Sequence, residues 1–277
     1  MRLQGKVALV TGAGRGIGGA IAVNMAREGA RVVLVSRTTN ELESQRRRIE
    51  EAGYPPAMIW AADVSEQKSV QSMVQAVLDT EGSIDILVNA AGISVAGPSE
   101  TLAVEDWRRC LATNLDGTFF CCQAVGAHMI ARKRGGKIIN ITSLVAHAAI
   151  PQRAAYAASK GGVKQLSQNL AVEWAPHNIQ VNTISPGFIL TEIVRDYIAR
   201  GVHRPELLTA RIPAGRMGEV DDVAGPAVFL ASAESDYITG TTLIVDADRV
   251  RGERTATRRP GRSLDPDIDF DAVRDIA

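Results

Sequence analysis

Short runs of apolar, mostly β-branched residues alternate along the chain with longer segments of helical periodicity. Runs that are apolar throughout are expected for strands buried on both faces, as in a parallel sheet covered by helices. The alternation therefore predicts an α/β fold with a doubly wound parallel sheet of about seven strands flanked by helices. The predicted strands are Lys6–Val10, Arg31–Val35, Ala57–Ala61, Ile84–Val88, Lys137–Ile141, Ile179–Ile184 and Thr242–Val245. The predicted helices include Gly16–Glu28, Asn40–Ala52, Glu66–Asp79 and Asn114–Arg132.

The composition changes after the last predicted strand. Residues 249–277 contain seven Arg and six acidic residues among few apolar side chains, so they can bury little surface alone. We expect a single catalytic domain over residues 1–248 and a charged C-terminal tail over residues 249–277. The tail is either weakly ordered or packed on a partner subunit.

Charge and cysteine content narrow the class of protein. Lys plus Arg equals Asp plus Glu at 31 each, so no net charge favours binding to nucleic acid or to a membrane surface. The three cysteines, Cys110, Cys121 and Cys122, are too few for a disulfide framework, and the histidines show no metal-ligand spacing. No apolar run approaches the roughly 18 residues of a membrane span. We expect a soluble cytoplasmic protein with no bound metal.

A glycine-rich turn follows the first predicted strand, from Thr11 to Gly18. Glycines at this place let the backbone approach a pyrophosphate, whose charge is then held at a helix N-terminus. The literal dinucleotide pattern matches glycines 14, 16 and 19, whereas the strand end at Val10 favours glycines 12, 16 and 18. The turn predicts Rossmann-type cofactor binding by Gly12, Arg15, Gly16, Ile17 and Gly18.

The choice of cofactor is read at the end of the second predicted strand, where an acidic side chain would bind the adenosine ribose of NAD. Here the residues are Ser36 and Arg37. No carboxylate stands there to repel a 2′-phosphate, and Arg37 and Arg15 can pair with one. We expect NADP(H).

Candidate catalytic residues come after the fifth predicted strand. Ser143 is followed by Tyr156 and Lys160, which are four residues apart and therefore share one face of a predicted helix. An ammonium near a phenol lowers the phenol pKa from about 10 toward neutrality, as a general acid/base requires.

Together these features resemble the short-chain dehydrogenase/reductase family over Gly5 to Asp246. The resemblance implies hydride transfer between nicotinamide and a substrate carbon, with Ser143 on the substrate oxygen, Tyr156 exchanging its proton and Lys160 lowering the Tyr pKa. It also implies that Asn114 holds a water of the proton relay. The further cofactor contacts implied are Asp63 and Val64 at the adenine, Asn89, Ala90 and Gly92 after the fourth strand, Tyr156 and Lys160 themselves, and Pro186, Gly187 and Thr191 at the nicotinamide.

The resemblance also bears on assembly and substrate. It implies a homotetramer or homodimer, and it makes residues 188–217 a mobile substrate lid. The basic run Arg132 to Arg134 resembles the carrier-docking patch of 3-oxoacyl-carrier-protein reductases, although Val172 fills a second docking position. The segment from Arg211 to Arg216 is similar to that of sugar-acid dehydrogenases. After Asp246 the chain departs from the two glycines usual in the family.

The sequence thus predicts an NADP(H)-dependent oxidoreductase of a carbonyl or secondary alcohol, with Tyr156 as general acid/base. Its substrate is a 3-oxoacyl thioester or a small ketone or polyol. A sugar-acid (gluconate-like) dehydrogenase and a catalytically silent NADP(H)-sensing module are the alternatives. An epimerase or dehydratase is disfavoured by the short chain and the glycine spacing.

Overall fold

A seven-stranded parallel sheet forms the centre of the molecule. The computed structural model describes residues 1–199, 206, 209 and 212–247. The strand order is β3-β2-β1-β4-β5-β6-β7, and every pairing is parallel. The strands are β1 Val7–Thr11, β2 Arg31–Ser36, β3 Met58–Ala61, β4 Ile86–Asn89, β5 Gly136–Ile141, β6 Ile179–Pro186 and β7 Thr242–Val245. All seven predicted strands are confirmed, with ends that differ by at most two residues.

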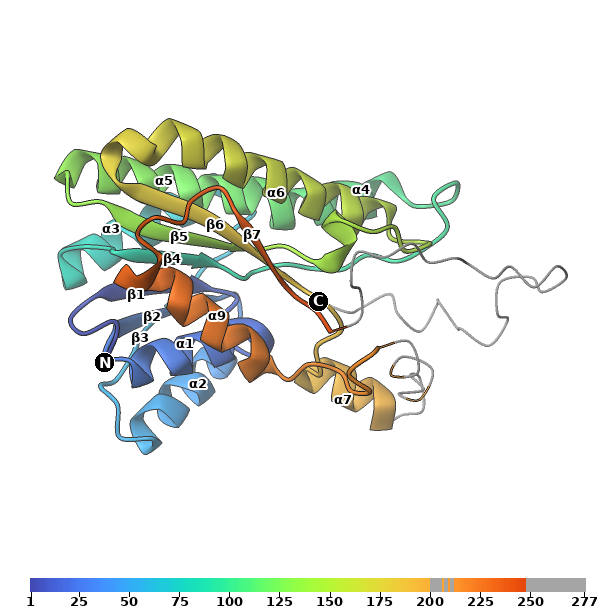
Figure 1. Cartoon of the computed structure of the whole chain (residues 1–277), viewed down its shortest axis with the longest axis horizontal. Helices are drawn as coiled ribbons and strands as arrows, with labels where there is room; N and C mark the ends of the chain where they lie inside the picture. The colour runs from blue at the N-terminus through green and yellow to red at the C-terminus, as the bar shows by residue number, and fades with distance from the viewer. Residues whose placement is uncertain (200–205, 207–208, 210–211, 248–277) are drawn as a thin grey trace, which may run out of the picture.

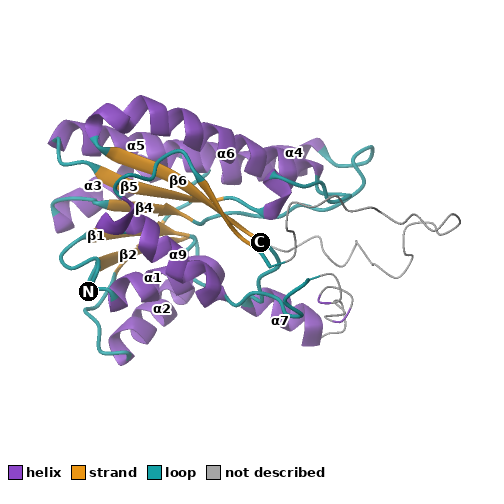
Figure 2. Ribbon diagram, viewed as in Figure 1, coloured by secondary structure: helices purple, strands orange, loops and turns teal. Residues whose placement is uncertain are grey.

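Helices cover both faces of this sheet (Figures 1 and 2). On one face lie α1 (Gly16–Arg27), α2 (Thr39–Glu51) and α9 (Val220–Ala231), and on the other lie α3 (Gln67–Glu81), α5 (Gly117–Arg132) and α6 (Ala154–Trp174). Two separate apolar cores fill the spaces between sheet and helices. Residues on β1, β4 and β5 alternate between the two cores, which explains why these strands read as continuous apolar runs.

The helix predicted over Asn114–Arg132 is wrong at its start. The structure has α4 at Val104–Leu111, then a π-helical turn at Ala112–Asp116, and only then α5. The sequence of α4 is strongly polar and only Cys110 is buried in it, so few apolar residues indicate a helix there. Asn114 therefore lies inside a wide turn between two helices, not at a helix start.

The remaining elements are short. Helix α7 spans Glu192–Ala199, and 3-10 turns occupy Leu144–Ala146, Ala175–His177 and Ala233–Ser235. Part of the predicted lid and all of the predicted tail lie outside the described residues. The domain division at residue 248 stays a prediction.

Candidate functional site

The candidate residues gather at the carboxyl edge of the sheet, where the strand order reverses between β1 and β4. Connections that leave these two strands diverge to opposite faces, which opens a crevice beyond their ends. The Thr11 hydroxyl joins the two strand ends: it accepts hydrogen bonds from the backbone N–H groups of Ala90 and Ala91, both at 3.2 Å. The loops after β1 and β4 are therefore held against each other.

The glycine turn after β1 is built for close backbone approach. Gly12 has a φ of +64°, and a Cβ there would lie 2.7 Å from the Ala91 nitrogen. A Cβ on Gly18 would overlap the Gly12 carbonyl oxygen. Gly16, also at positive φ (+57°), opens α1 with Ile17 beside it. This geometry fits the register of glycines 12, 16 and 18 and leaves a side-chain-free cradle that suits a pyrophosphate.

A carboxylate of the protein already interacts with this helix end. The Gly16 N–H donates to Glu192 Oε2 at 3.0 Å, although the two residues are 176 positions apart. The Thr191 methyl group lies over the same glycine, 3.7 Å from where a Gly16 Cβ would stand. An anion is therefore accepted at the start of α1, as the positive end of a helix dipole favours. The predicted nicotinamide segment and the predicted phosphate turn thus meet in space.

The residues predicted at the adenosine end make ion pairs within the chain. Arg37 lies 4.0 Å from the Asp63 carboxylate, and Arg15 lies 3.5 Å from that of Glu41. Both arginine side chains are more than half exposed. The Ser36 hydroxyl bonds the backbone of Thr38. These exposed pairs are weak, so a 2′-phosphate can compete for either guanidinium.

Next to these residues, Val64 is buried, and a Cβ on Gly117 would lie 2.8 Å from its side chain. The last side chain of β4 stabilises the sheet: Asn89 Nδ2 donates to Asn140 Oδ1 at 2.8 Å, and Asn140 Nδ2 donates to Ser167 Oγ at 2.8 Å. This buried polar chain links β4, β5 and α6.

Ser143, Tyr156 and Lys160 are brought together by β5 and α6. Ser143 lies two residues after the end of β5 and is the N-cap of the 3-10 turn Leu144–Ala146. There its hydroxyl accepts a hydrogen bond from the Val145 N–H. Its side chain also reaches the Tyr156 phenol, whose pKa it lowers by hydrogen bonding. The Lys160 ammonium lies 5.8 Å from the centre of the Tyr156 ring and donates to the Ile141 carbonyl at 2.9 Å. A hydroxyl, a phenol and an ammonium thus share one small region.

The direction of the Tyr156 pKa differs from the expectation. Burial raises this pKa above its usual value, and the lowering contributions come from Ser143 and from Arg153. Burial lowers the pKa of Lys160 from 10.5 to about 8. The ammonium is directed at the Ile141 carbonyl and only the face of the phenol ring is near it, so this arrangement favours the protonated form of Tyr156.

Asn114 is positioned by the π-helical turn. Its fully buried side chain accepts from the Ile93 N–H at 2.8 Å and donates to the Ile93 carbonyl at 2.9 Å. It also donates to Ser159 Oγ at 2.9 Å, next to Lys160. A Cβ on Gly92 would lie 3.2 Å from both Asn114 Oδ1 and Lys160 Nζ, which places all three residues side by side. A water held by Asn114 stays a prediction.

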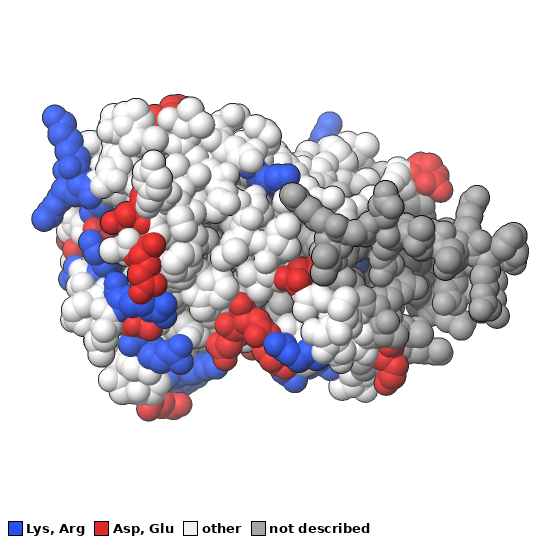
Figure 3. Space-filling view, in the orientation of Figure 1, with Lys and Arg blue, Asp and Glu red and all other residues white. Residues whose placement is uncertain are grey.

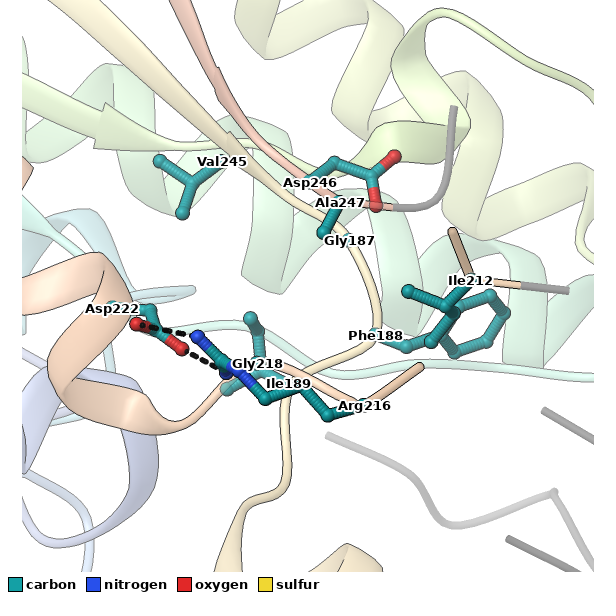
Figure 4. Close-up of a pocket in the computed structure, with 10 residues that line it drawn as sticks. All are labelled: Gly187, Phe188, Ile189, Ile212, Arg216, Gly218, Asp222, Val245, Asp246 and Ala247. Carbon is teal, nitrogen blue, oxygen red and sulfur yellow. Dashed lines mark hydrogen bonds and ion pairs between the residues drawn. The ribbon is translucent and has the colours of Figure 1, made fainter. Parts of the chain in front are cut away.

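A cavity of about 300 Å³ borders the predicted nicotinamide segment (Figure 4). It lies beyond Pro186 at the end of β6, and Gly187 and Asp246 line it. A Cβ on Gly187 would overlap the Asp246 carboxylate, so a larger residue here would require the Asp246 side chain to move. The cavity includes none of Ser143, Tyr156 and Lys160, and its Arg216–Asp222 ion pair is 2.7 Å long. It therefore borders the predicted nicotinamide segment and does not include the catalytic group.

Three further expectations concern reactive thiols, metal ligands and membrane spans. The cysteines Cys110, Cys121 and Cys122 are buried, and burial raises the pKa of each thiol, so they are poor nucleophiles. Among the described residues no three His, Cys, Asp or Glu side chains are placed to hold a metal. In the part of the chain that is described, no helix is both long and apolar enough for a membrane span. In Figure 3 the basic side chains in view lie mostly beside acidic ones.

Sequence reasoning missed several residues of this region. Glu192 and Glu41 carry no motif and were found only through their contacts with Gly16 and Arg15. Arg153 and Ser94, which are joined by a hydrogen bond of 2.6 Å, also carry no motif and were missed for the same reason. Glu192 directly follows Thr191, which is the one signal that pointed near it.

Comparison with known proteins gives extensive matches. A family model described as enoyl-(acyl carrier protein) reductase matches residues 12–247. A gluconate 5-dehydrogenase of Gluconobacter oxydans is 42% identical over 244 residues, 88% of this chain and 94% of that protein. A D-threitol dehydrogenase of Mycolicibacterium smegmatis is 44% identical over 246 residues, 88% of this chain and 93% of that protein. The structure of a gluconate 5-dehydrogenase from Burkholderia cenocepacia, in complex with NADP and tartrate, has a TM-score of 0.83 at 41% identity and covers 89% of this chain and 95% of that one.

Proposed function

The chain belongs to the short-chain dehydrogenase/reductase family, and from this premise we propose that it is an NADP(H)-dependent dehydrogenase of sugar acids or polyols. Family membership makes it an oxidoreductase that acts on CH–OH groups. The observation that carries the proposal is the convergence of Ser143, Tyr156 and Lys160 at the sheet edge that also holds the glycine turn.

The cofactor proposal rests on the fit of the cradle. Gly12, Gly16 and Gly18 would hold the pyrophosphate, Arg15 and Arg37 the 2′-phosphate, and Thr191 the nicotinamide end. The Glu192 carboxylate at the Gly16 N–H supports an anion there. NADP in a solved gluconate 5-dehydrogenase of high structural similarity agrees with this choice. When bound, NADP⁺ accepts a hydride from the substrate carbon.

The residues of this chain would orient the substrate and move its proton. Ser143 would donate a hydrogen bond to the substrate oxygen, and Tyr156 would exchange the hydroxyl proton with it. The Lys160 ammonium would stabilise the phenolate form of Tyr156 once its own position changes from the Ile141 carbonyl toward the bound cofactor. Asn114 would hold the Ile93 and Ser159 groups that fix this arrangement and would bind the relay water.

The substrate class follows from the relatives and from the basic run at Arg132. Relatives named for gluconate and threitol favour a hydroxylated small molecule. Arg132 forms a 2.7 Å ion pair with Asp85 and is mostly buried, so it is unavailable for docking an acidic carrier. Val172 at the second docking position is exposed and uncharged. These observations weigh against an acyl-carrier substrate.

A homotetramer or homodimer stays a prediction. The aromatic side chains of Trp107 and Phe119 are each more than a third exposed on α4 and α5. Such side chains are suited to burial against a second copy of the chain.

The test replaces Tyr156 with Phe. We expect kcat for the oxidation of gluconate or a polyol to fall by a factor of about 10² to 10⁴, the usual contribution of a general acid/base. The dissociation constant of NADPH, followed by its fluorescence, should change less than about threefold. Tyr54→Phe, a change on the opposite side of the sheet, serves as control. Unchanged turnover in Tyr156→Phe would contradict the proposed role, and NADPH binding without turnover of any substrate by the wild type would favour the sensing module.

A further inference from the structure

A guanidinium group stands beside Tyr156 at the start of α6. Arg153 is the N-cap residue of this helix, three positions before Tyr156, a spacing that brings Cβ atoms to roughly 5–6 Å. Its Nη1 donates a hydrogen bond of 2.6 Å to the hydroxyl of Ser94, a buried residue in the segment after β4. The Gly97 N–H donates to the Gln152 carbonyl at 3.0 Å, so the two loops that carry Ser94 and Arg153 are also tied by their backbones. The guanidinium is therefore held in place.

Arg153 has no acidic partner within the described part of the chain. Arg132, Arg195 and Arg216 each lie within 2.7 Å of a carboxylate, whereas no carboxylate of a described residue pairs with Arg153. Burial lowers the pKa of Arg153, and the Tyr156 phenol is the charged or chargeable group that faces it. A partly buried cation without a counter-ion is unfavourable unless a ligand supplies one.

The donors of Arg153 are only partly used. A guanidinium carries five N–H donors in a planar fork that matches the two oxygens of a carboxylate. Among the hydrogen bonds to described residues, only the bond to Ser94 engages the fork. The guanidinium is close enough to the phenol of Tyr156 for the two groups to interact electrostatically. We therefore expect an anion bound at Arg153 to belong to the substrate rather than to the pyrophosphate, which is expected at Gly16.

We propose that Arg153, positioned by Ser94, binds a carboxylate of the substrate and makes the enzyme selective for hydroxy acids of the sugar-acid class over neutral polyols. This inference rests on the proposed function and narrows its substrate class. Tyr156 and Arg153 would then contact two groups of one small molecule. Tyr156 would contact the hydroxyl that is oxidised, and Arg153 would bind the anionic group that orients the molecule. No covalent step is added to the reaction.

The experiment compares two substrates that differ in one group. D-gluconate and D-sorbitol have the same six-carbon chain, with a carboxylate in the first where the second has a hydroxymethyl group. For the wild type we expect kcat/KM for gluconate to exceed that for sorbitol by at least 30-fold. Arg153→Gln should lower kcat/KM for gluconate 30- to 100-fold more than kcat/KM for sorbitol, mainly through the KM for gluconate. Arg153→Lys keeps the charge but loses the fork, so an intermediate loss is expected.

Two controls separate this role from others. Arg47→Gln, an exposed arginine on α2, should leave both substrates unchanged. Arg153 also lowers the pKa of Tyr156, so loss of the guanidinium shifts the pH profile of both substrates together. The ratio of the two kcat/KM values isolates carboxylate binding from this shared effect. Equal losses of kcat/KM for gluconate and sorbitol in Arg153→Gln would overturn the inference. A wild type with a higher kcat/KM for sorbitol than for gluconate would also overturn it, but would leave the proposed function intact.

A binding measurement covers the case in which neither compound is oxidised. Gluconate is titrated calorimetrically into the NADP⁺-loaded wild type and the NADP⁺-loaded Arg153→Gln variant. Their melting temperatures are compared first, to confirm that the variant is folded. A dissociation constant at least tenfold larger in the variant supports the carboxylate site. This holds even if no turnover is observed and the proposed function fails. Equal affinity in the two proteins would overturn it.

Discussion

The two ends of the crevice differ in how their polar groups are satisfied. At the catalytic end, Asn114, Ser143 and Lys160 are bound to backbone groups and, in the case of Asn114, also to the hydroxyl of Ser159, and these contacts are buried or partly buried. At the phosphate end, Arg15, Arg37 and the Gly16 N–H are each matched by a carboxylate of the chain, with exposed side chains. The first arrangement is a fixed framework, and the second is a set of replaceable contacts.

This difference shows where the free energy of ligand binding is set. A buried network resists rearrangement because each broken bond leaves an unsatisfied polar group. An exposed ion pair is worth little and gives way to a stronger anion. Cofactor affinity is thus adjustable by the carboxylates Glu41, Asp63 and Glu192, whereas the catalytic geometry is set by the fold.

The largest effect is expected from Lys160→Met, which removes a buried charge from the catalytic end. Burial lowers the pKa of Lys160 from 10.5 to about 8, so the folded chain carries a cost of about 3 kcal/mol at neutral pH. That cost is fully present below about pH 8 and is lost as the pH rises toward 10.5, because only the unfolded chain binds the proton in that window. The lost bond to Ile141 removes about 1 kcal/mol. At pH 7 the free energy of unfolding of the variant should therefore exceed that of the wild type by ~2 kcal/mol. The variant should also lose activity.

Urea unfolding at pH 7 and pH 10 measures this difference. The stability gain should disappear by pH 10, where the wild-type lysine is largely neutral in the folded state. Lys68→Met, at an exposed position of α3, is the matched control and should show no such pH dependence. A variant that is less stable than the wild type at pH 7 would mean that the Lys160 contacts outweigh its burial.

A second test breaks the phosphate end at Arg37. Replacement with Gln should weaken NADPH binding by about 10- to 150-fold, since a charge-assisted contact contributes about 1.5 to 3 kcal/mol. NADH, which lacks the 2′-phosphate, should be affected less than threefold. Equilibrium fluorescence titration with both cofactors gives the two constants. Equal weakening of NADPH and NADH would show that Arg37 does not reach the phosphate and that its partner is Asp63 alone.

The smallest effect sharpens the comparison at Glu192. The Gln variant keeps the side-chain size but removes the charge that competes with a pyrophosphate at the Gly16 N–H. A charge at a helix terminus contributes about 0.3 to 1 kcal/mol, so NADPH should bind about two- to fivefold more tightly. Glu173→Gln, an exposed change on α6, should leave the affinity unchanged. Weaker binding in Glu192→Gln would mean that this carboxylate assists the cofactor and does not compete with it.

The sequence predicted the fold and the framework of the site for physical reasons that are local. All seven strands were predicted because burial on both faces makes them apolar throughout. The proximity of Tyr156 and Lys160 was predicted because helical spacing is fixed, and their catalytic roles stay a prediction. The π-helical turn around Asn114 was missed because its sequence has no pattern distinct from a helix. Glu192 and Arg153 were missed because their partners, Gly16 and Ser94, are 176 and 59 positions away. Contacts between distant loops depend on the assembled sheet and leave no trace in spacing.

The π-helical turn at Ala112–Asp116 makes this stretch of chain sensitive to its length. Each residue of an α-helix advances the direction of the side chains by about 100°, and the wide turn takes up one additional residue without that advance. Deleting one residue there would rotate Cys121 and Cys122 away from the sheet if Cys110 kept its place beside Ser159. Single-residue deletions between residues 111 and 117 should therefore be far less tolerated than substitutions. In proteins that diverge from this one, we expect the amino acids of this segment to change while its length stays the same.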